Sequence, residues 1–536
     1  MARSQPYTVA CDGGLLTSSN SIDLLKTPGV ATRLQNFEVS IEGGYRRING
    51  YTKYKVGDVT PTQPAGSTAT ILGVFPYADG VIACVSDDIY FSNDGANWLQ
   101  INRSSVSGSG DNHTAFTGRS ILNRTNQGQC SFALAEGATF DYGEVFIADG
   151  ANKIYSFRME GTGNLNTRTF FAAEINVTNN KAVKFITVHD SRLVAAGVAD
   201  NLNTVFFSAL NDFDNFAAGG SNTLADQIVG IKGFREDLII FCENSIYKHI
   251  NIGLGLNAGE RVDPITDNVG CLSGYSIQEI GGDLIFLAPD GIRTVAGTAR
   301  IGDVELGTIS KQIQPILSEL ARNIDEYTIT SLVIREKSQY RLYYSNPLSV
   351  NSAQEGIIGT LRPNGFQWSE TKGLEVTDVN SNFDHNGVEV YYHGDTNGFV
   401  YTHDVGHSFD GSNINAIYET PDYDYGDFGT LKTLHYIKMS ITPEGNVQPT
   451  LTVKFDFGNL DIPQPDSILL DSVPAPSTFS NAVFGSAIFG AAEQPLVRES
   501  LVGSGHSNNF RFSSNDSNAP YIVNGFYVDY IPSGRR

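Results

Sequence analysis

Cysteines are few in this sequence, and their spacing excludes two common roles. Five occur among 536 residues, and no two of them form a C-x-x-C pair. A disulfide framework or a zinc site would need closely and regularly spaced pairs. Two of them, Cys84 in "VIACV" and Cys242 in "LIIFC", end apolar runs, which is typical of small buried side chains. The pattern predicts reduced, buried thiols in a reducing compartment.

Long hydrophobic runs are also missing. The longest apolar stretches are far shorter than the roughly 20 residues that a membrane-spanning helix needs. The first residues, "MARSQPYTVACDGG", include one arginine but no apolar core, so we expect no signal peptide. From these absences we expect a soluble protein that is made in a cytoplasm and has no membrane span.

Basic residues are outnumbered by acidic ones. The chain has 36 Lys and Arg against 58 Asp and Glu, a formal net charge of −22. Proteins that grip nucleic acid use Lys and Arg to displace the counterions of the phosphates, so this balance disfavours such a function. The acids are dispersed along the chain, and by itself the charge indicates little more than solubility.

Glycine and aromatic residues, by contrast, are plentiful. The sequence has 55 Gly, 24 Tyr and 31 Phe, with 40% hydrophobic and 11% aromatic residues. That content of apolar residues excludes disorder, and Tyr and Phe are favoured on pleated surfaces. The length is sufficient for two or three domains. The composition therefore predicts a β-rich globular protein.

A hairpin pattern recurs along the chain. In "GGDLIFLAPDGIRTVAG", residues 281–297, two short apolar runs flank Pro289-Asp290-Gly291, which is a turn sequence. Similar hairpins begin about 45 to 64 residues apart, near Val81, Val145, Leu193, Leu238, Leu284, Arg341 and Val388.

A propeller blade takes roughly 40–50 residues, and each hairpin would supply the middle strands of one blade. The alternative is a β-sandwich whose turns happen to share this spacing. We predict an all-β protein with a β-propeller of six or seven blades.

Two segments interrupt the hairpins. In residues 307–324, apolar side chains stand at helical spacing, and Pro315 marks the start of a regular helix with Gln314 as a weak cap. We expect this inserted amphipathic helix on the side of the propeller. After residue 410 the strands become longer, which predicts a C-terminal β-sandwich-like domain with a loop at 473–495. The expected domains are thus an N-terminal segment, 1–65, that joins the propeller, the propeller itself, 66–409, and the sandwich, 410–536.

One stretch gathers residues that bind metals elsewhere. "HGDTNGFVYTHDVGHSFDG" holds three histidines and three aspartates: His393, His403, His407, Asp395, Asp404 and Asp410. Such residues are metal ligands. However, His403 and His407 share a face only on a helix, whereas this stretch is predicted to form strands and turns. A polar hairpin end is the favoured interpretation, and a metal site is the alternative.

Other polar motifs are predicted to form turns without a catalytic role. "SNDGANW", residues 92–98, resembles the Asp-box of sialidase-like propellers but is one residue short, and that box is a structural turn. "FSALNDFDNF", residues 207–216, places two acids between aromatics. The pairs Asp87/Asp88 and Glu236/Asp237 occur in turns, where Asp is expected. The sequence has no G-x-S-x-G, P-loop or zinc motif. We therefore predict no catalytic, cofactor-binding or metal-binding residues, no cofactor, and a protein that is not an enzyme.

Several segments together resemble one family, the tail nozzle or tail-tube hub proteins of short-tailed bacteriophages, some of them called head-to-tail stabilization proteins. The likeness spans most of the chain. The segments that carry it are "GGLLTSSNSIDLLKTPGVATRLQNFEVSIEGGYRRINGYTKY" (13–54), "FREDLIIFCENSIYKHI" (234–250), "GCLSGYSIQEIGGDLIFLAPDGIRTVAG" (270–297), "IGDVELGTISKQIQPIL" (301–317) and the final "GRR" (534–536).

The resemblance implies a structural virion protein. Its relatives form rings, typically hexameric, below the portal and adaptor proteins, with tail fibres or tip proteins beneath and genomic DNA passing through without sequence-specific binding. The N-terminal segment would face the adaptor. The expected location is the virion tail, after assembly in the cytoplasm of the host bacterium. Six copies at −22 would carry −132, and an acidic channel wall would let DNA slide without adhering.

Two other functions remain as alternatives. A receptor- or glycan-binding propeller of the phage tail would carry exposed Trp and Tyr on one face, yet the sequence has only Trp98 and Trp368. A glycosidase-like propeller would need paired carboxyl groups near a pocket, one of them with a raised pKa.

Overall fold

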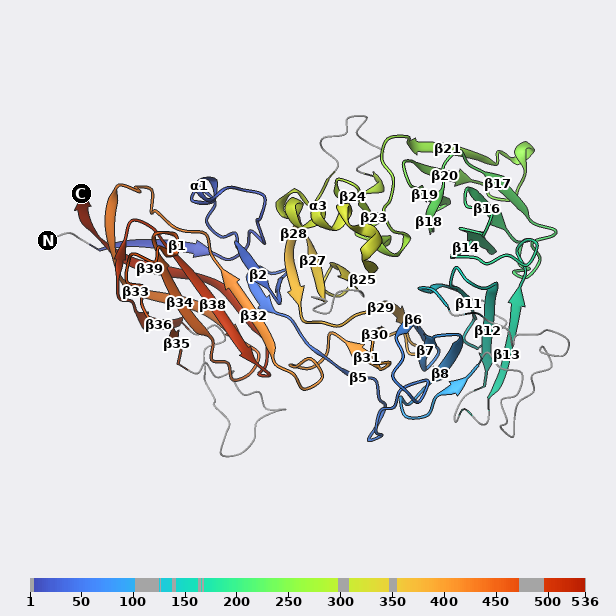
Figure 1. Cartoon of the computed structure of the whole chain (residues 1–536), viewed down its shortest axis with the longest axis horizontal. Helices are drawn as coiled ribbons and strands as arrows, with labels where there is room; N and C mark the ends of the chain where they lie inside the picture. Colours follow the sequence, from blue (N-terminus) through green and yellow to red (C-terminus); the bar gives the residue numbers. More distant parts are fainter. Residues whose placement is uncertain are drawn as a thin grey trace.

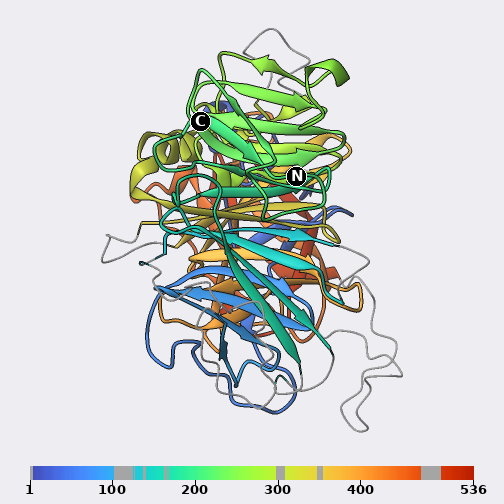
Figure 2. The same cartoon turned by 90° about the vertical axis from the view of Figure 1, so that its right-hand side faces the viewer.

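The computed structural model describes residues 4–101, 125, 127–136, 141–161, 165, 168–296, 308–346, 354–471 and 496–535. These residues form two lobes, a β-propeller and a β-sandwich, with both chain ends at the far end of the sandwich (Figure 1). Seen from the propeller end, the teal and green strands, β12 to β21, face the viewer (Figure 2). The predicted loop at 473–495 lies outside the described residues.

Sheets of three or four strands follow one another around the propeller. The first strands of successive sheets are neighbours: β10 contacts β14, β14 contacts β18, β25 contacts β29, and β29 contacts β6. The first three sheets are β6–β9 (Ile71–Tyr77, Gly80–Val85, Asp88–Ser92, Leu99–Gln100), β10–β13 (Ser131–Ala135, Glu144–Ala148, Ile154–Glu160, Thr169–Ile175) and β14–β17 (Phe185–His189, Arg192–Ala196, Thr204–Phe207, Gly220–Thr223).

The remaining sheets complete the ring. They are β18–β21 (Ile228–Phe234, Asp237–Cys242, Ile246–Ile250, Arg261–Thr266), the three-stranded β22–β24 (Gln278–Ile280, Asp283–Ala288, Gly291–Thr294), β25–β28 (Thr328–Ile334, Gln339–Ser345, Glu355–Arg362, Gly365–Lys372) and β29–β31 (Asp378–Phe383, Glu389–Gly394, Val400–His403) with β5 (Tyr51–Lys53). The described residues thus form six four-stranded blades and one three-stranded sheet, which confirms the predicted propeller.

The repeated hairpins lie at the centres of these sheets. The one that flanks Pro289-Asp290-Gly291 is β23 and β24, and its counterparts are the middle pairs, such as β7 and β8 or β19 and β20. Apolar side chains of neighbouring sheets fill the space between them. Aromatic pairs mark three of these layers, Phe75–Phe132 at 5.1 Å, Phe146–Phe213 at 5.4 Å and Phe241–Phe286 at 5.2 Å between ring centroids. Burying these faces is what no single hairpin could do alone.

The predicted helix is present as α3, Gln314–Arg322, preceded by a 3-10 turn at Lys311–Ile313. Pro315 occupies its first turn, and its buried residues Leu317 and Leu320 pack into the core beside β24. The other helical segments are α1 (Ser21–Leu24) and 3-10 turns at Leu256–Ala258, Gly274–Ser276, Ile324–Glu326 and Asp456–Gly458. In the part of the chain that is described, no helix is long and apolar enough to cross a membrane.

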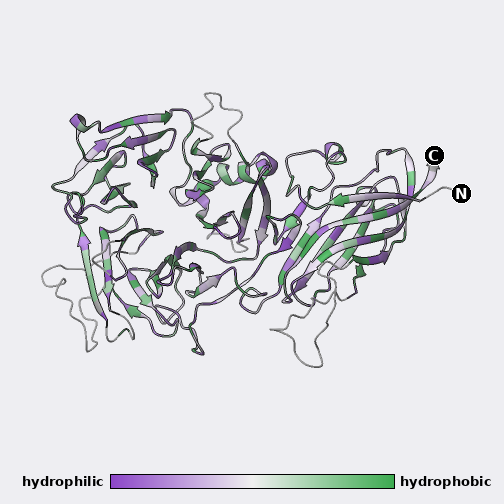
Figure 3. Cartoon of the chain, turned by 180° about the vertical axis from the view of Figure 1, so that it is seen from behind, coloured by the Kyte–Doolittle hydropathy of each residue, from purple (hydrophilic) through white to green (hydrophobic). Residues whose placement is uncertain are grey.

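The C-terminal lobe is a sandwich of two sheets. One face comes from β33 (Thr430–Pro443), β36 (Leu496–Ser500), β37 (Ser504–Gly505) and β39 (Tyr521–Arg535), and the other from β32 (Ile414–Glu419), β34 (Thr450–Phe455), β35 (Ile468–Leu469) and β38 (Asn508–Asp516). Hydrophobic and hydrophilic residues alternate along these strands (Figure 3). Between the sheets, Phe526 packs against Phe510 at 5.3 Å and Phe512 at 5.8 Å.

The N-terminal segment contributes strands to both lobes. β1 (Gln5–Ala10), β3 (Phe37–Val39) and β4 (Tyr45–Arg47) join the sheet of β39, while β5 pairs with β31 and closes the last blade. β2 (Arg33–Gln35) lies between β28 and β32, so one nine-stranded sheet runs from a propeller blade into the sandwich. Residues 1–65 are therefore not a unit of their own, because their strands complete sheet edges in each lobe.

Candidate functional site

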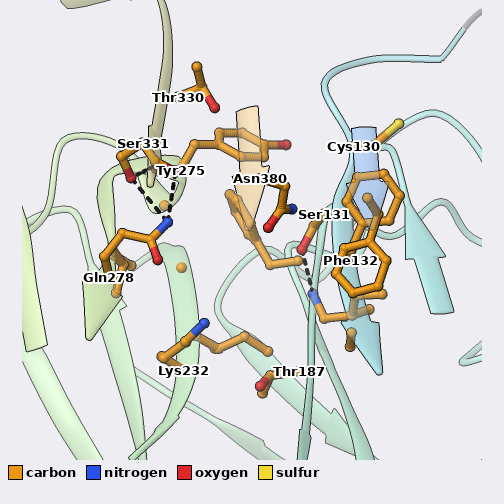
Figure 4. Close-up of a pocket in the computed structure, with 18 of the residues that line it drawn as sticks. Cys130, Ser131, Phe132, Thr187, Lys232, Tyr275, Gln278, Thr330, Ser331 and Asn380 are labelled. Carbon is orange, nitrogen blue, oxygen red and sulfur yellow. Dashed lines mark hydrogen bonds between the residues drawn. The ribbon is translucent and has the colours of Figure 1, made fainter. Parts of the chain in front are cut away.

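A polar cavity lies in the central channel of the propeller, where the first strands of the seven sheets come together. Its volume is about 390 Å³, and its lining comes from β6, β10, β14, β18, β22, β25 and β29 (Figure 4). Every blade therefore contributes to one site, although its strands are up to about 300 residues apart in the sequence. A cavity of this size suits a small molecule.

Hydrogen bonds across the channel wall hold the three-stranded sheet in the ring. Gln278 Nε2 donates to Ser331 O at 2.8 Å, and Ser331 Oγ donates to Tyr275 O at 2.7 Å. Tyr275 Oη in turn donates to Gln129 O at 2.7 Å. The 3-10 turn at Gly274–Ser276 places Tyr275 between these partners, so side chains connect the sheet β22–β24 with its neighbours.

Asp378 supplies the one carboxyl group among the described residues that line the channel. It is only 4% exposed, and it accepts hydrogen bonds from Val74 N at 2.8 Å and Thr330 Oγ1 at 3.2 Å. Burial raises its pKa to about 7. Near neutral pH this group is therefore present in both its protonated and its ionised form. Glycosidases of the common kind use two carboxyl groups, whereas the lining offers this one.

Two basic side chains also line the channel. Arg335 forms an ion pair with Glu389, whereas Lys232 has no ion pair within the described residues. The Lys232 side chain points into the channel (Figure 4), and burial lowers the pKa of its ammonium group. The channel thus combines hydrogen-bonding groups with one carboxyl group and one unpaired amine, an arrangement that could hold a small polar molecule.

The predicted histidine cluster comes together only in part. His393 and His403 are both buried, with their Nδ1 atoms 3.2 Å apart, and His403 Nε2 lies 3.0 Å from Tyr343 Oη. Burial lowers the pKa of both rings well below the ordinary value, helped by the neighbouring His403 and Arg341 respectively. The rings of His393 and His403 are therefore neutral, buried and in contact with each other. We interpret them as a structural pair in the wall between two blades.

The other members of that cluster have separate roles. Asp395 accepts hydrogen bonds from Phe399 N at 2.8 Å and from Tyr401 Oη at 2.9 Å, which closes its own turn. Asp410 pairs with Lys53 at 3.1 Å, and His407 is exposed. No group of three or more His, Cys, Asp or Glu that could hold a metal ion occurs within the described ranges. The stretch corresponds to the polar hairpin end.

A buried ion network connects the two lobes, and sequence reasoning missed it. Arg341 on β26 lies 2.9 Å from Glu38 on β3 and 3.1 Å from Asp404, and Lys337 lies 3.0 Å from Glu38 and 2.7 Å from Asp404. Burial opposes ionisation of both acids, but Lys337 and Arg341 hold the pKa of each carboxyl below its ordinary value. Glu38 and Arg341 are 303 residues apart, so no local sequence pattern could predict this contact. We call these four residues the junction network.

The remaining polar motifs are turns, as the sequence indicated. Asp94 of "SNDGANW" accepts hydrogen bonds from Ala96 N and Asn97 N, both at 2.8 Å, and Trp98 Nε1 donates to Thr62 O. In "FSALNDFDNF", Asp212 accepts a hydrogen bond from Asn215 and Phe216 is buried. The pairs Asp87/Asp88 and Glu236/Asp237 stand where β7 meets β8 and β18 meets β19.

All five cysteines are buried and free, at positions 11, 84, 130, 242 and 271. Burial raises the pKa of Cys11, Cys242 and Cys271 to about 12, so these thiols stay protonated. The two tryptophans are not gathered on an exposed face either. Trp368 is fully buried, and Trp98 is half-buried in its turn.

Comparison with known proteins identifies no family. No family model matches the sequence, and no curated protein matches it. Similar solved structures include an exo-beta-1,3-galactanase from Phanerochaete chrysosporium, solved with galactose, at 10% identity and a TM-score of 0.27, covering 90% of this chain and 100% of that one. The WD40 domain of Pan2 from Neurospora crassa has 10% identity and a TM-score of 0.29 over 69% of this chain and 89% of that one.

A third similar structure is the extracellular domain of a putative hybrid two component system from B. thetaiotaomicron. It has 8% identity and a TM-score of 0.35 over 66% of this chain, and the match spans 39% of that chain's length. At such identities and TM-scores these likenesses carry no argument about activity.

The galactanase nevertheless corrects one prediction. The sequence was interpreted as that of a protein that is not an enzyme, because no catalytic motif was found. That inference is wrong as an exclusion, since a propeller enzyme is among the similar structures and propellers build their sites from residues scattered over many blades. The absence of short catalytic motifs therefore does not exclude an enzyme.

Proposed function

We propose that this chain is a structural virion protein of a short-tailed bacteriophage, a subunit of the nozzle ring of the tail. The ring is a homo-hexamer below the portal and adaptor proteins, with tail fibres or tip proteins beneath it, and genomic DNA is retained in and ejected through its lumen. The resemblance of segments in the N-terminal region, the propeller and the C-terminus to tail nozzle proteins is the starting point for this proposal.

The observation that supports it best is the way in which the two lobes are joined. A nine-stranded sheet continues from β25–β28 through β2 into β32, β38, β34 and β35. Across the junction, Asn36 N donates to Glu370 O at 2.8 Å and Lys372 N donates to Asn36 Oδ1 at 2.9 Å. The buried junction network lies beside this sheet. A subunit whose lobes share strands and buried charges resists bending, which suits a part that carries the load of packed DNA.

Charge supports the same function. Six copies of a chain at −22 would carry −132, so acidic groups facing a lumen would repel phosphates and leave the DNA free to slide. The lumen in this proposal lies between subunits. The propeller's own channel, at about 390 Å³, is far too small for a double helix.

Negative-stain imaging and light scattering of the purified full-length chain, alone and with its portal-adaptor ring, test this function. The expected result is a hollow ring of about six copies, alone or on the adaptor. A monomer or trimer that never docks would overturn the proposal.

A second candidate function, a receptor- or glycan-binding propeller, is favoured by the axial channel. Phe132, Asn380 and Gln278 all line it, and Lys232 contributes an unpaired amine (Figure 4). Screening the protein against a glycan array tests this candidate. Binding that is lost in Phe132→Ala and Lys232→Gln but retained in Trp98→Ala would support it, and an array without binding would remove it.

A further inference from the structure

The outer face of the sandwich carries a pair of like charges that nothing in the described residues neutralises. Lys438 on β33 and Arg498 on β36 are directly opposite each other in the antiparallel register. Both point away from the core, since Ile437 and Met439 on either side of Lys438 are buried. Like charges in this position destabilise a sheet, and neither side chain has an acidic partner among the residues described.

Aromatic rings surround these two cations. The ring of Tyr436 lies 4.5 Å from the Arg498 guanidinium and 5.6 Å from the Lys438 amine, and Tyr527 lies 5.8 Å from the same amine. Tyr and Arg are the side chains that contribute most energy to protein interfaces. We call Tyr436, Lys438, Arg498 and Tyr527 the basic face.

An apolar groove of about 460 Å³ adjoins the basic face. It is hollow because the row that runs across Leu496, Ser440, Gly525 and Ala10 has small side chains in three of its four positions. Leu496 at its rim is 69% exposed. A partner for this surface must therefore offer an apolar side chain with a negative charge beside it.

The other sheet of the sandwich presents such a segment. Residues 456–471 contain four aspartates and no basic residue. Leu460 is 96% exposed, Leu469 is 62% exposed and Phe457 is 46% exposed. Asp461, next to Leu460, is exposed and forms no ion pair within the described part of the chain. We call residues 456–471 the acidic edge.

We infer that the acidic edge of one copy of this chain docks on the basic face of the next, with Leu460 in the apolar groove and Asp461 between Lys438 and Arg498. Within one chain the groove opens on the outer face of the seven-stranded sheet, whereas the acidic edge belongs to the opposite sheet. The contact therefore forms between copies. It is head-to-tail, because two different surfaces meet, and contacts of this type generate rings or open chains. The inference rests on the proposed ring and names the surfaces that build it.

The test uses two full-length variants, each of which lacks one half of the contact. The face variant is Lys438→Glu with Arg498→Glu, and the edge variant is Leu460→Ser with Asp461→Asn. Sedimentation velocity over a concentration series measures self-association of each. We expect the wild-type chain to associate, and each variant alone to associate at least about tenfold more weakly. The face variant replaces attraction by repulsion, and the edge variant loses both the negative charge and the apolar side chain that docks.

An equimolar mixture of the two variants is the decisive sample. The edge variant keeps an intact face and the face variant keeps an intact edge, so the mixture should give a dimer that cannot extend. Lys26→Glu, which reverses an exposed charge in the turn after α1, is the matched control and should associate as the wild type does. Unchanged thermal melting of every variant confirms that the fold is retained.

The remaining outcomes of this experiment distinguish a failure of the proposed contact from a failure of the proposed ring. A wild-type chain that stays monomeric, or variants that associate like the wild type, would overturn the proposed contact, and rings seen on the adaptor would still support the nozzle function. Association that depends on both surfaces but yields only open chains would support the contact and overturn the closed nozzle ring.

Discussion

The junction between the lobes and the outer face of the sandwich each hold two basic side chains side by side, yet their surroundings are opposite. Lys337 and Arg341 at the junction lie within 3.1 Å of Glu38 and Asp404. Lys438 and Arg498 on the sandwich are opposite each other, contact tyrosine rings and form no ion pair within the described residues. The junction charges are paired within the chain, whereas the like charges on the sandwich are the reason to propose that another molecule supplies their partner.

The largest effect is expected at the junction. Glu38→Gln removes one of the two acidic partners of Arg341, which is 2% exposed, and leaves Asp404 alone to balance both Arg341 and Lys337. The free energy of unfolding should fall by about 3–5 kcal/mol, measured by denaturant unfolding. Glu444→Gln is the matched control, because Glu444 contacts Arg46 while being 38% exposed and should cost no more than about 1 kcal/mol. Equal losses in the two variants would contradict a special role for the junction.

The buried carboxyl groups should make the stability of the fold depend on pH. Glu38 and Asp404 have lowered pKa values, so their contribution to stability is present at neutral pH and is lost as the pH falls through those values. Asp378 behaves in the opposite way. Its pKa is raised to about 7, so the folded chain keeps a proton that the unfolded chain releases, and stability falls as the pH rises from about 4 to about 7.

Asp378→Asn removes this dependence. Relative to the wild type, the variant should gain about 4 kcal/mol of unfolding free energy between pH 4 and pH 8, a figure that follows from about three pKa units. Denaturant unfolding at a series of pH values measures the difference. A constant difference between the two proteins across this range would show that Asp378 titrates normally. Thr330→Val, which removes one hydrogen bond to the carboxyl group, should raise the pKa further.

The smallest effect is expected on the basic face. Lys438→Gln and Arg498→Gln each relieve a repulsion but also lose contact with a tyrosine ring, so each should change stability by less than about 0.5 kcal/mol. A double-mutant cycle should nevertheless show an unfavourable coupling of about 0.2–1 kcal/mol between them. A cycle between Glu38 and Arg341 should show a favourable coupling. The coupling on the face should shrink in high salt, and a favourable sign there would remove the reason to expect a partner.

Local signals predicted much of the fold and little of the candidate site. The turn at Pro289-Asp290-Gly291 and its counterparts predicted the central hairpins, and the spacing of Ile313, Leu317 and Leu320 predicted helix α3. The channel could not be predicted, because its residues lie on seven strands that are far apart in the sequence and show no motif. Of the three histidines in the polar stretch, only two come together. His393 and His403 are on paired strands, while His407 is not.

By itself the sequence determined which short segments become hairpins, because turn chemistry and the alternation of apolar residues act between neighbours in the chain. Only the tertiary structure decided that β5 closes the blade of β31, that β1 pairs with β39, and that Glu38 meets Arg341. These contacts join residues hundreds of positions apart, and a strand edge or a buried charge accepts any geometrically suitable partner. Which partner arrives depends on how the whole chain packs.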